Sequence, residues 1–362
     1  MKIGIIGLPN SGKTTVYNAL TRGNAVTDAF STNQVEVHTA VVDVPDPRID
    51  RLSAMYRPKK TIYAKVTYND IGGVTAGGPQ SGGFGGPLIN AIANNDALLH
   101  VVRAFKDPNV PHPSGRVNPG QDWRNLEAEL ILNDLMAVER RLERLEADLK
   151  KPNLQHQQRE QLEAEQELFQ RLQAHLEAEQ PLRAFEFEPD EEKMVRSFTF
   201  LSQKPLLVVL NLGDEQPEPD LSSFEVGPRA AVTTLRGKLE AELAQMSPDE
   251  ADEFLADFGI RELGLNRMIR MSHELLELKD FFTVGEDEVR AWTVPAGANA
   301  QECAAAIHTD LGRGFIRAET ITYDDLIAAG SMAEARKHGQ LRLEGKTYEV
   351  KDGDILNIRF NI

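Results

Sequence analysis

The chain has 362 residues, of which 41% are hydrophobic and 27% charged, and its formal net charge is −16. This composition is ordinary for a folded soluble protein of roughly two or three domains, and no segment is basic enough to indicate a dedicated nucleic-acid binder. The single cysteine, Cys303, excludes an intrachain disulfide and a cysteine-built zinc site, and no apolar run is long enough to span a bilayer. We therefore expect a cytoplasmic protein without a signal peptide, and with neither a membrane nor DNA as its partner.

The first predicted elements are a strand at residues 2–6, a loop at 7–14 and a helix that begins near Lys13. The loop has the pattern G-x-x-x-x-G-K-[ST], in which backbone N–H groups point at phosphate oxygens. Lys13 is expected to reach the β- and γ-phosphates, and the Thr14 hydroxyl is expected to bind Mg²⁺. The alternative is a chance glycine-rich turn, but strand, loop and helix stand in the order that phosphate binding requires. The chain is therefore predicted to bind a nucleoside triphosphate.

Two further elements of a nucleotide site follow. The segment 30–34 precedes an alternating strand pattern, at the point where a nucleotide switch places a threonine on Mg²⁺. Thr32 is available there, although polar residues before a strand are common in any loop. A second strand, 62–68, leads into a D-x-x-G motif that begins at Asp70 and ends at Gly73. In such a motif the carboxylate holds Mg²⁺, usually through water, and the glycine N–H contacts the γ-phosphate.

A glycine-rich stretch comes next, with eight glycines between Gly72 and Gly86. It can be interpreted as a linker, but its place directly after D-x-x-G favours a switch loop that the γ-phosphate orders. Val74 stands where a Ras-type hydrolase has the glutamine that orients water, so another group must orient the water here. From spacing alone His112, in the loop 111–119, is simply a loop histidine.

From Asp122 onward the pattern becomes helical. Apolar residues alternate in spacing between four and three, which is a heptad seam, at Ile131, Leu135, Val138, Leu142, Leu145 and Leu149. After a break at 151–153, a second amphipathic run ends before Pro181. Two helices joined by a short break predict an antiparallel coiled-coil hairpin, whose charged outer faces are expected to be solvated.

An α/β pattern then resumes with a buried strand at 205–210, which ends at the N-x-x-D motif of residues 211–214. Such folds read the nucleotide base at this place, so Asn211 and Asp214 are predicted to contact it. From about residue 279, short strands surround a helix, which predicts a separate α+β domain.

The predicted organisation thus has three parts. A discontinuous nucleotide domain comprises residues 1–120 and 186–278, the helical hairpin is inserted at 121–185, and a small C-terminal domain covers 279–362.

Together these motifs resemble the YchF family, also called Obg-like ATPases, which are P-loop NTPases of the TRAFAC class. The resemblance runs over nearly the whole chain and is carried by residues 7–15, 45–48, 70–73, 112–119, 264–267, 289–295, 307–310 and 314–318. It implies an α/β fold, with a Ras-like nucleotide domain, an antiparallel coiled-coil insertion and a C-terminal TGS domain of the ubiquitin-like α+β type. It also implies ATP hydrolysis and association with the ribosome.

The resemblance also implies roles for single residues. The family lacks the catalytic glutamine, in agreement with Val74, and is thought to use the histidine of the H-x-S-G loop, which is His112 here. Asn10 matches the asparagine that helps hold K⁺ beside the phosphates in related cation-dependent hydrolases. The predicted nucleotide contacts are Asn10, Ser11, Gly12, Lys13, Thr14, Thr15, Gly73, Asn211 and Asp214. The predicted metal ligands are Thr14, Asp70 and Thr32.

Three departures from the family pattern keep alternatives open. The switch threonine of the family aligns with Gln34, the glycine-rich stretch replaces a switch with lysines and a glutamate, and the base-reading N-x-x-E ends in Asp214. An aspartate there suits guanine, whose N1–H and N2–H₂ donate as a pair, whereas Leu212 lacks the lysine of a guanine site. We expect slow, Mg²⁺-dependent ATP hydrolysis with substantial GTP binding. The alternatives are a GTP-preferring hydrolase and a nucleotide-binding module that hardly hydrolyses.

Overall fold

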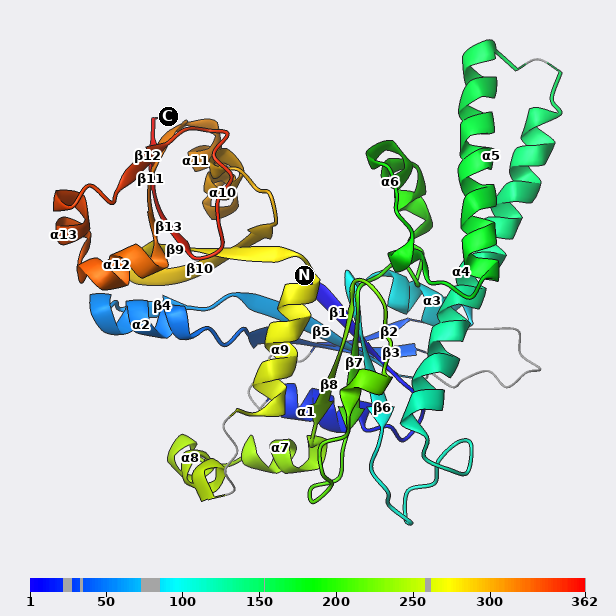
Figure 1. The fold of residues 1–362 in the computed structure, drawn as a ribbon, viewed down its shortest axis with the longest axis horizontal. Helices are drawn as coiled ribbons and strands as arrows, with labels where there is room; N and C mark the ends of the chain where they lie inside the picture. Colours follow the sequence, from blue (N-terminus) through cyan, green and yellow to red (C-terminus); the bar gives the residue numbers. More distant parts are fainter. Residues whose placement is uncertain (22–27, 33–34, 73–84, 153, 258–261, 362) are drawn as a thin grey trace. The chain divides into compact units, whose positions relative to one another are not determined.

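The structure is a computed structural model that describes residues 1–21, 28–32, 35–72, 85–152, 154–257 and 262–361 (Figure 1). The chain forms two compact units. The first contains Met1–Val42 and Thr67–Leu275, and the second contains Asp43–Val66 and Leu276–Ile362. Each unit has its own β-sheet.

Seven strands form the sheet of the first unit. They are β1 (Lys2–Ile6), β2 (Asp28–Thr32), β3 (Val35–Asp43), β5 (Lys65–Ile71), β6 (Ala97–Arg103), β7 (Leu206–Asn211) and β8 (Ala230–Leu235). Their order is β2-β3-β5-β1-β6-β7-β8. β1 pairs in parallel with β5 and β6, and the parallel pairing continues through β7 to β8. The carboxyl ends of these strands meet at one edge, which is the usual ligand side of a parallel sheet.

One predicted loop is a strand in the structure. The segment 30–34 is expected to be a loop before a strand, but residues 30–32 belong to β2, which pairs antiparallel with β3 from Asp28 with Thr39 to Thr32 with Val35. Residues 33 and 34 lie outside the described residues. The pairing places a polar segment at the edge of the sheet, where one side of the strand needs no partner. The local composition resembles a loop for that reason.

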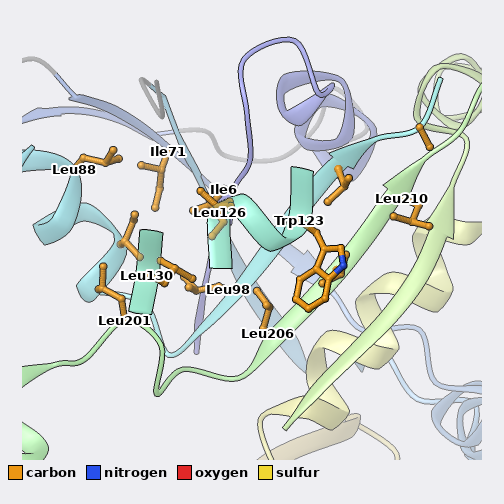
Figure 2. Packing of buried hydrophobic residues seen from close by; sticks show 14 of the residues in the cluster. Ile6, Ile71, Leu88, Leu98, Trp123, Leu126, Leu130, Leu201, Leu206 and Leu210 are labelled. Carbon is orange, nitrogen blue, oxygen red and sulfur yellow. The ribbon is translucent and has the colours of Figure 1, made fainter. Parts of the chain in front are cut away.

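Helices of the first unit cover the sheet or extend from it (Figure 1). They are α1 (Lys13–Thr21), α3 (Gly86–Ala93), α4 (Pro119–Leu149), α5 (His156–Glu177), α6 (Pro189–Val195), α7 (Gly237–Leu243), α8 (Pro248–Asp257) and α9 (Gly264–Leu275). Short 3₁₀ turns are found at Leu182–Ala184, Arg196–Phe198 and Leu221–Ser223. Figure 2 shows the start of α4 on the core, where Trp123 and Leu126 pack with Ile6, Leu98 and Leu206 of the strands.

The two longest helices, α4 and α5, form the inserted hairpin and extend beyond the rest of the unit (Figure 1). Val138 and Leu145 of α4 are fully buried in one cluster with Leu168, Phe169 and Leu172 of α5. The predicted apolar seam of α4 therefore faces the second helix.

Buried charged groups fix the base of the hairpin. Asp134 of α4 accepts the backbone N–H groups of Leu201 at 2.9 Å and Ser202 at 2.7 Å. Burial raises the pKa of the Asp134 carboxyl to about 6, although these hydrogen bonds lower it. Glu127 of the same helix forms a buried ion pair with Arg183. These contacts join α4 to the segment that leads into β7.

The second unit has a six-stranded sheet. Its strands are β4 (Lys60–Ile62), β9 (Leu278–Val284), β10 (Glu288–Pro295), β11 (Phe315–Thr322), β12 (Arg342–Glu344) and β13 (Asp354–Phe360), in the order β12-β11-β13-β9-β10-β4. Its helices are α2 (Pro47–Tyr56), α10 (Ala300–Ile307), α11 (Thr309–Arg313), α12 (Tyr323–Ala329) and α13 (Met332–Lys337). Cys303 is buried in the core with Phe281 and Leu356, and burial raises the pKa of its thiol to about 12.

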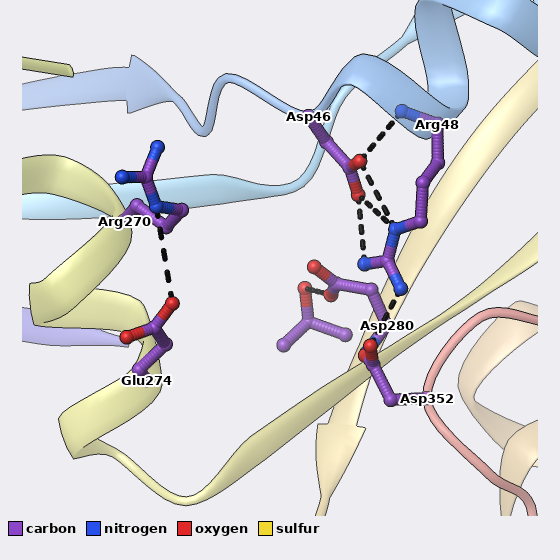
Figure 3. A network of polar contacts seen from close by, with 7 residues as sticks. Asp46, Arg48, Arg270, Glu274, Asp280 and Asp352 are labelled. Carbon is purple, nitrogen blue, oxygen red and sulfur yellow. Dashed lines mark hydrogen bonds and ion pairs between the residues drawn. The ribbon is translucent and has the colours of Figure 1, made fainter. Parts of the chain in front are cut away.

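The segment 43–66 packs with the C-terminal residues, so the compact units divide the chain differently from the predicted domains. β4 pairs with β10 at the edge of the sheet. Figure 3 shows Arg48 of α2 donating to Asp46 at 2.9 Å and to Asp352 at 2.5 Å. The Arg48 guanidinium also lies 5.2 Å from the centre of the Phe282 ring. These are long-range contacts, which no local pattern in the sequence records.

Candidate nucleotide site

The phosphate loop joins β1 to α1, as the sequence predicts. Gly7 and Gly12 have φ angles of 151° and 95°. A Cβ atom on Gly7 would lie 2.4 Å from the carbonyl oxygen of Val101, and one on Gly12 would lie 2.2 Å from Asn211 Nδ2. Both positions therefore need glycine, because the loop lies directly against the ends of β6 and β7.

Lys13 begins α1, and its ammonium group donates to the carbonyl oxygens of Gly7 at 2.9 Å and Leu8 at 3.1 Å. Burial lowers the pKa of Lys13, and the nearby Asp70 carboxylate opposes this effect. Two neutral carbonyls are weak partners for a buried ammonium group compared with a phosphate. The side chain can therefore exchange them for phosphate oxygens. Thr14 is exposed and Thr15 is half-buried in the first turn of the helix.

Asp70 lies near the end of β5, opposite Ile5 of β1. The residue is 6% exposed, and its Oδ1 atom is buried with no hydrogen-bond partner among the residues that the structure describes. Burial raises the pKa of the Asp70 carboxyl, while Lys13 and His38 lower it. A buried carboxylate oxygen without a partner is costly unless a cation binds it. Asp70 therefore fits a Mg²⁺ ligand.

No cluster of three or more His, Cys, Asp or Glu that could hold a metal occurs in the described part of the chain. A Mg²⁺ ion at Asp70 and Thr14 would take its other oxygens from phosphates and water, as Mg²⁺ usually does at nucleotide sites. Thr32 is the last residue of β2, and its metal role stays a prediction. Gly73 and Val74 lie outside the described residues, as does most of the glycine-rich stretch.

Asn211, at the end of β7, is 4% exposed and joins two loops of the site. Its Nδ2 donates to the carbonyl oxygen of Ser11 at 3.0 Å, and its Oδ1 accepts the backbone N–H of Gly237 at 3.0 Å. Ser11 itself is buried. Asn211 therefore holds the phosphate loop beside the start of α7.

Asp214 follows in the loop after β7, with 38% of its side chain exposed. Lys238 Nζ lies 3.8 Å from its carboxylate, and Arg236 Nε donates to its backbone carbonyl at 3.2 Å. Leu212 is buried in the core and does not replace the lysine of a guanine site. The carboxylate of Asp214 is thus accessible to a nucleotide base. Lys238 lies close enough to compete with the base for this carboxylate.

The loop after β6 carries His112 and is held by Arg103, which is 3% exposed. The Arg103 guanidinium donates to the carbonyl oxygens of Phe105 at 3.2 Å and Val110 at 2.9 Å. Asn10 Nδ2 of the phosphate loop donates to the carbonyl oxygen of Pro111 at 3.0 Å. The structure therefore brings the phosphate loop against the residue that precedes His112.

His112 has 5% of its side chain exposed, and its two ring nitrogens are engaged. Nε2 lies 3.1 Å from Asp122 Oδ2, and Nδ1 lies 2.9 Å from the Ser114 hydroxyl. Sequence analysis did not assign a role to Asp122 or Arg103. A charged residue that ends an apolar strand was a usable signal for Arg103, whereas no local pattern points to Asp122.

Among the described helices, none is both long and apolar enough to cross a membrane.

Comparisons with known proteins found similar sequences and a similar structure that cover nearly the whole chain. Residues 2–129 match a family model described as "50S ribosome-binding GTPase". Residues 278–361 match the model YchF-GTPase_C, described as "Protein of unknown function (DUF933)".

The ribosome-binding ATPase YchF of Bacillus subtilis is 40% identical, with 99% of each chain covered. That of Escherichia coli O157:H7 is 37% identical and covers 100% of this chain and 99% of its own. The solved structure of the Schizosaccharomyces pombe YchF GTPase is 29% identical and has a TM-score of 0.86, covering 99% of this chain and 97% of its own. The chain therefore belongs to the YchF family.

Proposed function

We propose that this protein is a slow, Mg²⁺-dependent ATP hydrolase that acts in the cytoplasm as a nucleotide-dependent switch on or near the ribosome. The observation that carries this proposal is the Asp70 carboxylate, which interacts electrostatically with Lys13 of the phosphate loop. Its buried Oδ1 atom has no hydrogen-bond partner in the described part of the chain. Full-length relatives are named ribosome-binding ATPases, which supports ATP as the substrate and the ribosome as the partner.

The proposed hydrolysis uses a small set of groups of the chain. The N–H groups of the phosphate loop and Lys13 hold the β- and γ-phosphates. Thr14 and Asp70 hold Mg²⁺, which neutralises phosphate charge when bound. His112 orients the attacking water, because the valine at position 74 cannot do so. Each of these groups acts by position and charge, as is usual in phosphoryl transfer.

A K⁺ ion beside the phosphates is part of the proposal. Asn10 donates through Nδ2 to the carbonyl oxygen of Pro111, and its Oδ1 atom is the side-chain oxygen that would bind the cation. Asn10 also has a positive φ of 62°, which an asparagine tolerates better than most residues. Faster phosphate release in K⁺ than in Na⁺ is the expected result, and equal rates would contradict this part.

We keep the three predicted domains as functional divisions. The nucleotide domain, residues 1–120 and 186–278, would bind ATP. The insertion at 121–185 would be the helical hairpin with solvated outer faces, and residues 279–362 would form the C-terminal domain with a TGS-type fold. A family model that begins at residue 278 supports the last boundary.

GTP is the second candidate substrate, because the Asp214 carboxylate is exposed and can accept the paired donors of guanine. Lys238 at 3.8 Å weakens this acceptor, and Leu212 is buried in place of the guanine-site lysine. We therefore place ATP first. Similar proteins carry both names, since the bacterial relatives are called ATPases and the fission yeast structure a GTPase.

Competition binding with ATP, GTP, ADP and GDP tests the base, and phosphate release with Mg²⁺ and K⁺ tests the reaction. A GTP preference above roughly tenfold, or about 1.4 kcal/mol, would overturn the ATP assignment. Tight ATP binding without phosphate release would show a nucleotide-binding module instead of a hydrolase. Co-sedimentation with ribosomes in ATP, ADP and no nucleotide tests the switch, and binding that is the same in all three would contradict it.

A further inference from the structure

The His112 ring is held from two sides in a way that fixes its tautomer. Nδ1 lies 3.2 Å from the backbone nitrogen of Ser114. A backbone N–H can only donate, so Nδ1 is the nitrogen without a hydrogen in the neutral ring. The hydrogen is therefore on Nε2, which donates to Asp122 Oδ2 at 3.1 Å.

The two sides of the ring differ in how easily water can reach them. Asp122 is 3% exposed, whereas Ser114 is exposed. The Ser114 hydroxyl lies 2.9 Å from Nδ1 and 3.2 Å from the carbonyl oxygen of Arg116, and its single hydrogen can be donated to either of them. An exposed hydroxyl with a second acceptor is readily replaced by a water molecule, since little hydrogen bonding is lost. Nδ1 is thus the nitrogen that can meet a water.

Ser114 holds the Nδ1 side of the ring and Asp122 the Nε2 side, whereas other groups nearby hold only the loop. Within the described part of the chain, Asp122 is the charged side chain at ion-pair distance from His112. The Arg103 guanidinium lies 3.5 Å from the carbonyl oxygen of Pro111, to which Asn10 also donates. These two residues fix the peptide that precedes His112, whereas the Nε2 side of the ring depends on Asp122.

The geometry points to Asp122 as the positioning residue of His112. By accepting the Nε2 hydrogen, it keeps the ring in one tautomer and directs Nδ1 towards the water that attacks the nucleotide. This inference rests on the role of His112 in the proposed function. Asp122 belongs to α4, and its backbone N–H donates to the carbonyl oxygen of Asn118 at 2.9 Å. The first turn of the inserted hairpin therefore also holds the water-orienting histidine.

Four variants of the full-length chain test this role: Asp122→Ala, Asp122→Asn, His112→Ala and, as a matched control, Asp134→Asn. Asp134 is also buried on α4, but it binds Leu201 and Ser202 instead of a histidine. The measurements are kcat and KM for ATP, the melting temperature, and the nitrogen NMR spectrum of the His112 ring, which distinguishes its two tautomers.

Asp122→Ala is expected to lower kcat about 100-fold, with KM unchanged within about twofold. Because Ser114 alone among the described residues then holds the ring, the preference for one tautomer should also weaken. Asp122→Asn should restore about a tenth of the wild-type kcat, because its amide oxygen can still accept the Nε2 hydrogen. Asp134→Asn should lower the melting temperature and leave kcat and the tautomer as in the wild type.

Different outcomes separate this inference from the proposed function. If His112→Ala loses turnover while both Asp122 variants keep the wild-type kcat and a single tautomer, the positioning role is wrong and the proposed function stands. A lower melting temperature as the sole change in the Asp122 variants would make Asp122 structural, like Asp134. Wild-type turnover in His112→Ala would remove His112 from the reaction, and the role of Asp122 with it.

Discussion

Two clusters of charged side chains, one in each compact unit, are satisfied to very different degrees. In the second unit, Arg48 donates to Asp46 and Asp352 and lies over the Phe282 ring (Figure 3). In the first unit, Asp70 Oδ1 has no partner among the described residues, and Lys13 donates to carbonyl oxygens of its own loop.

This difference separates a structural role from a binding role. The half-buried Arg48 is paired and hydrogen-bonded to two carboxylates, of which Asp352 is exposed, so this cluster needs nothing more than the protein and water supply. The Asp70 carboxylate lowers the stability of the ligand-free protein until a cation binds. A charge that the fold leaves unsatisfied therefore marks the nucleotide site, whereas the satisfied cluster holds the segment 43–66 to the C-terminal residues.

The largest effect is expected from Lys13→Ala, which should weaken ATP and GTP binding by more than about 100-fold, or roughly 2.7 kcal/mol. Lys13 donates to loop carbonyls and does not belong to a hydrophobic core cluster, so the fold should remain when its expected phosphate contact is removed. Calorimetric titration with each nucleotide measures the loss. Lys59→Ala, which removes an exposed lysine of the second unit, is the control. Wild-type affinity in a folded Lys13→Ala protein would contradict the site.

A fragment of residues 279–362 should melt much lower than the same fragment linked to the segment 43–66. Without that segment, β10 loses its edge partner β4, and Asp352 loses its ion pair with Arg48. Thermal melting of the two fragments, followed by circular dichroism, gives the comparison. Equal melting temperatures would show that the predicted C-terminal domain folds by itself.

Arg48→Ala should lower the free energy of unfolding of the second unit by about 1.5–3 kcal/mol, the usual range for hydrogen bonds to charged groups. It leaves Asp46 and Asp352 without their cation, while nucleotide affinity should not change. Chemical denaturation measures the loss, and Lys59→Ala, which breaks an exposed ion pair with Asp287, should have little effect. A weaker affinity for ATP in Arg48→Ala would show that this cluster is not purely structural.

The smallest effect has the opposite sign. Asp70→Asn should raise the free energy of unfolding of the nucleotide-free protein by about 1 kcal/mol, because it removes a buried unpartnered charge, while Mg²⁺-dependent binding weakens. Burial raises the pKa of Asp70, so the folded state favours the protonated form. The wild type should therefore gain more stability than the variant as the pH falls through this pKa. Melting temperatures of the wild type and of Asp70→Asn at several pH values test this prediction. A less stable Asp70→Asn protein would contradict the view that the Asp70 charge destabilises the nucleotide-free protein.

The sequence by itself determined the elements whose signal is local. The phosphate loop needs glycine at fixed positions between a strand and a helix, and positions 7 and 12 have positive φ angles as expected. The heptad spacing in α4 predicted the face that packs on α5, because helical periodicity decides which side chains share a face. The order of the motifs along the chain was enough to identify the family.

The tertiary structure decided everything that depends on contacts between distant residues. Asn211 lies 200 positions from Ser11, and Arg48 lies 304 positions from Asp352, yet each pair is hydrogen-bonded. Asp122 and His112 are only ten positions apart, but a loop and a helix start separate them, so no periodicity relates the two. The local sequence of a segment favours its secondary structure, but it does not determine which distant residues the segment contacts. Only the packed chain shows that Arg48 meets two carboxylates, whereas Asp70 Oδ1 has no hydrogen-bond partner among the residues that the structure describes.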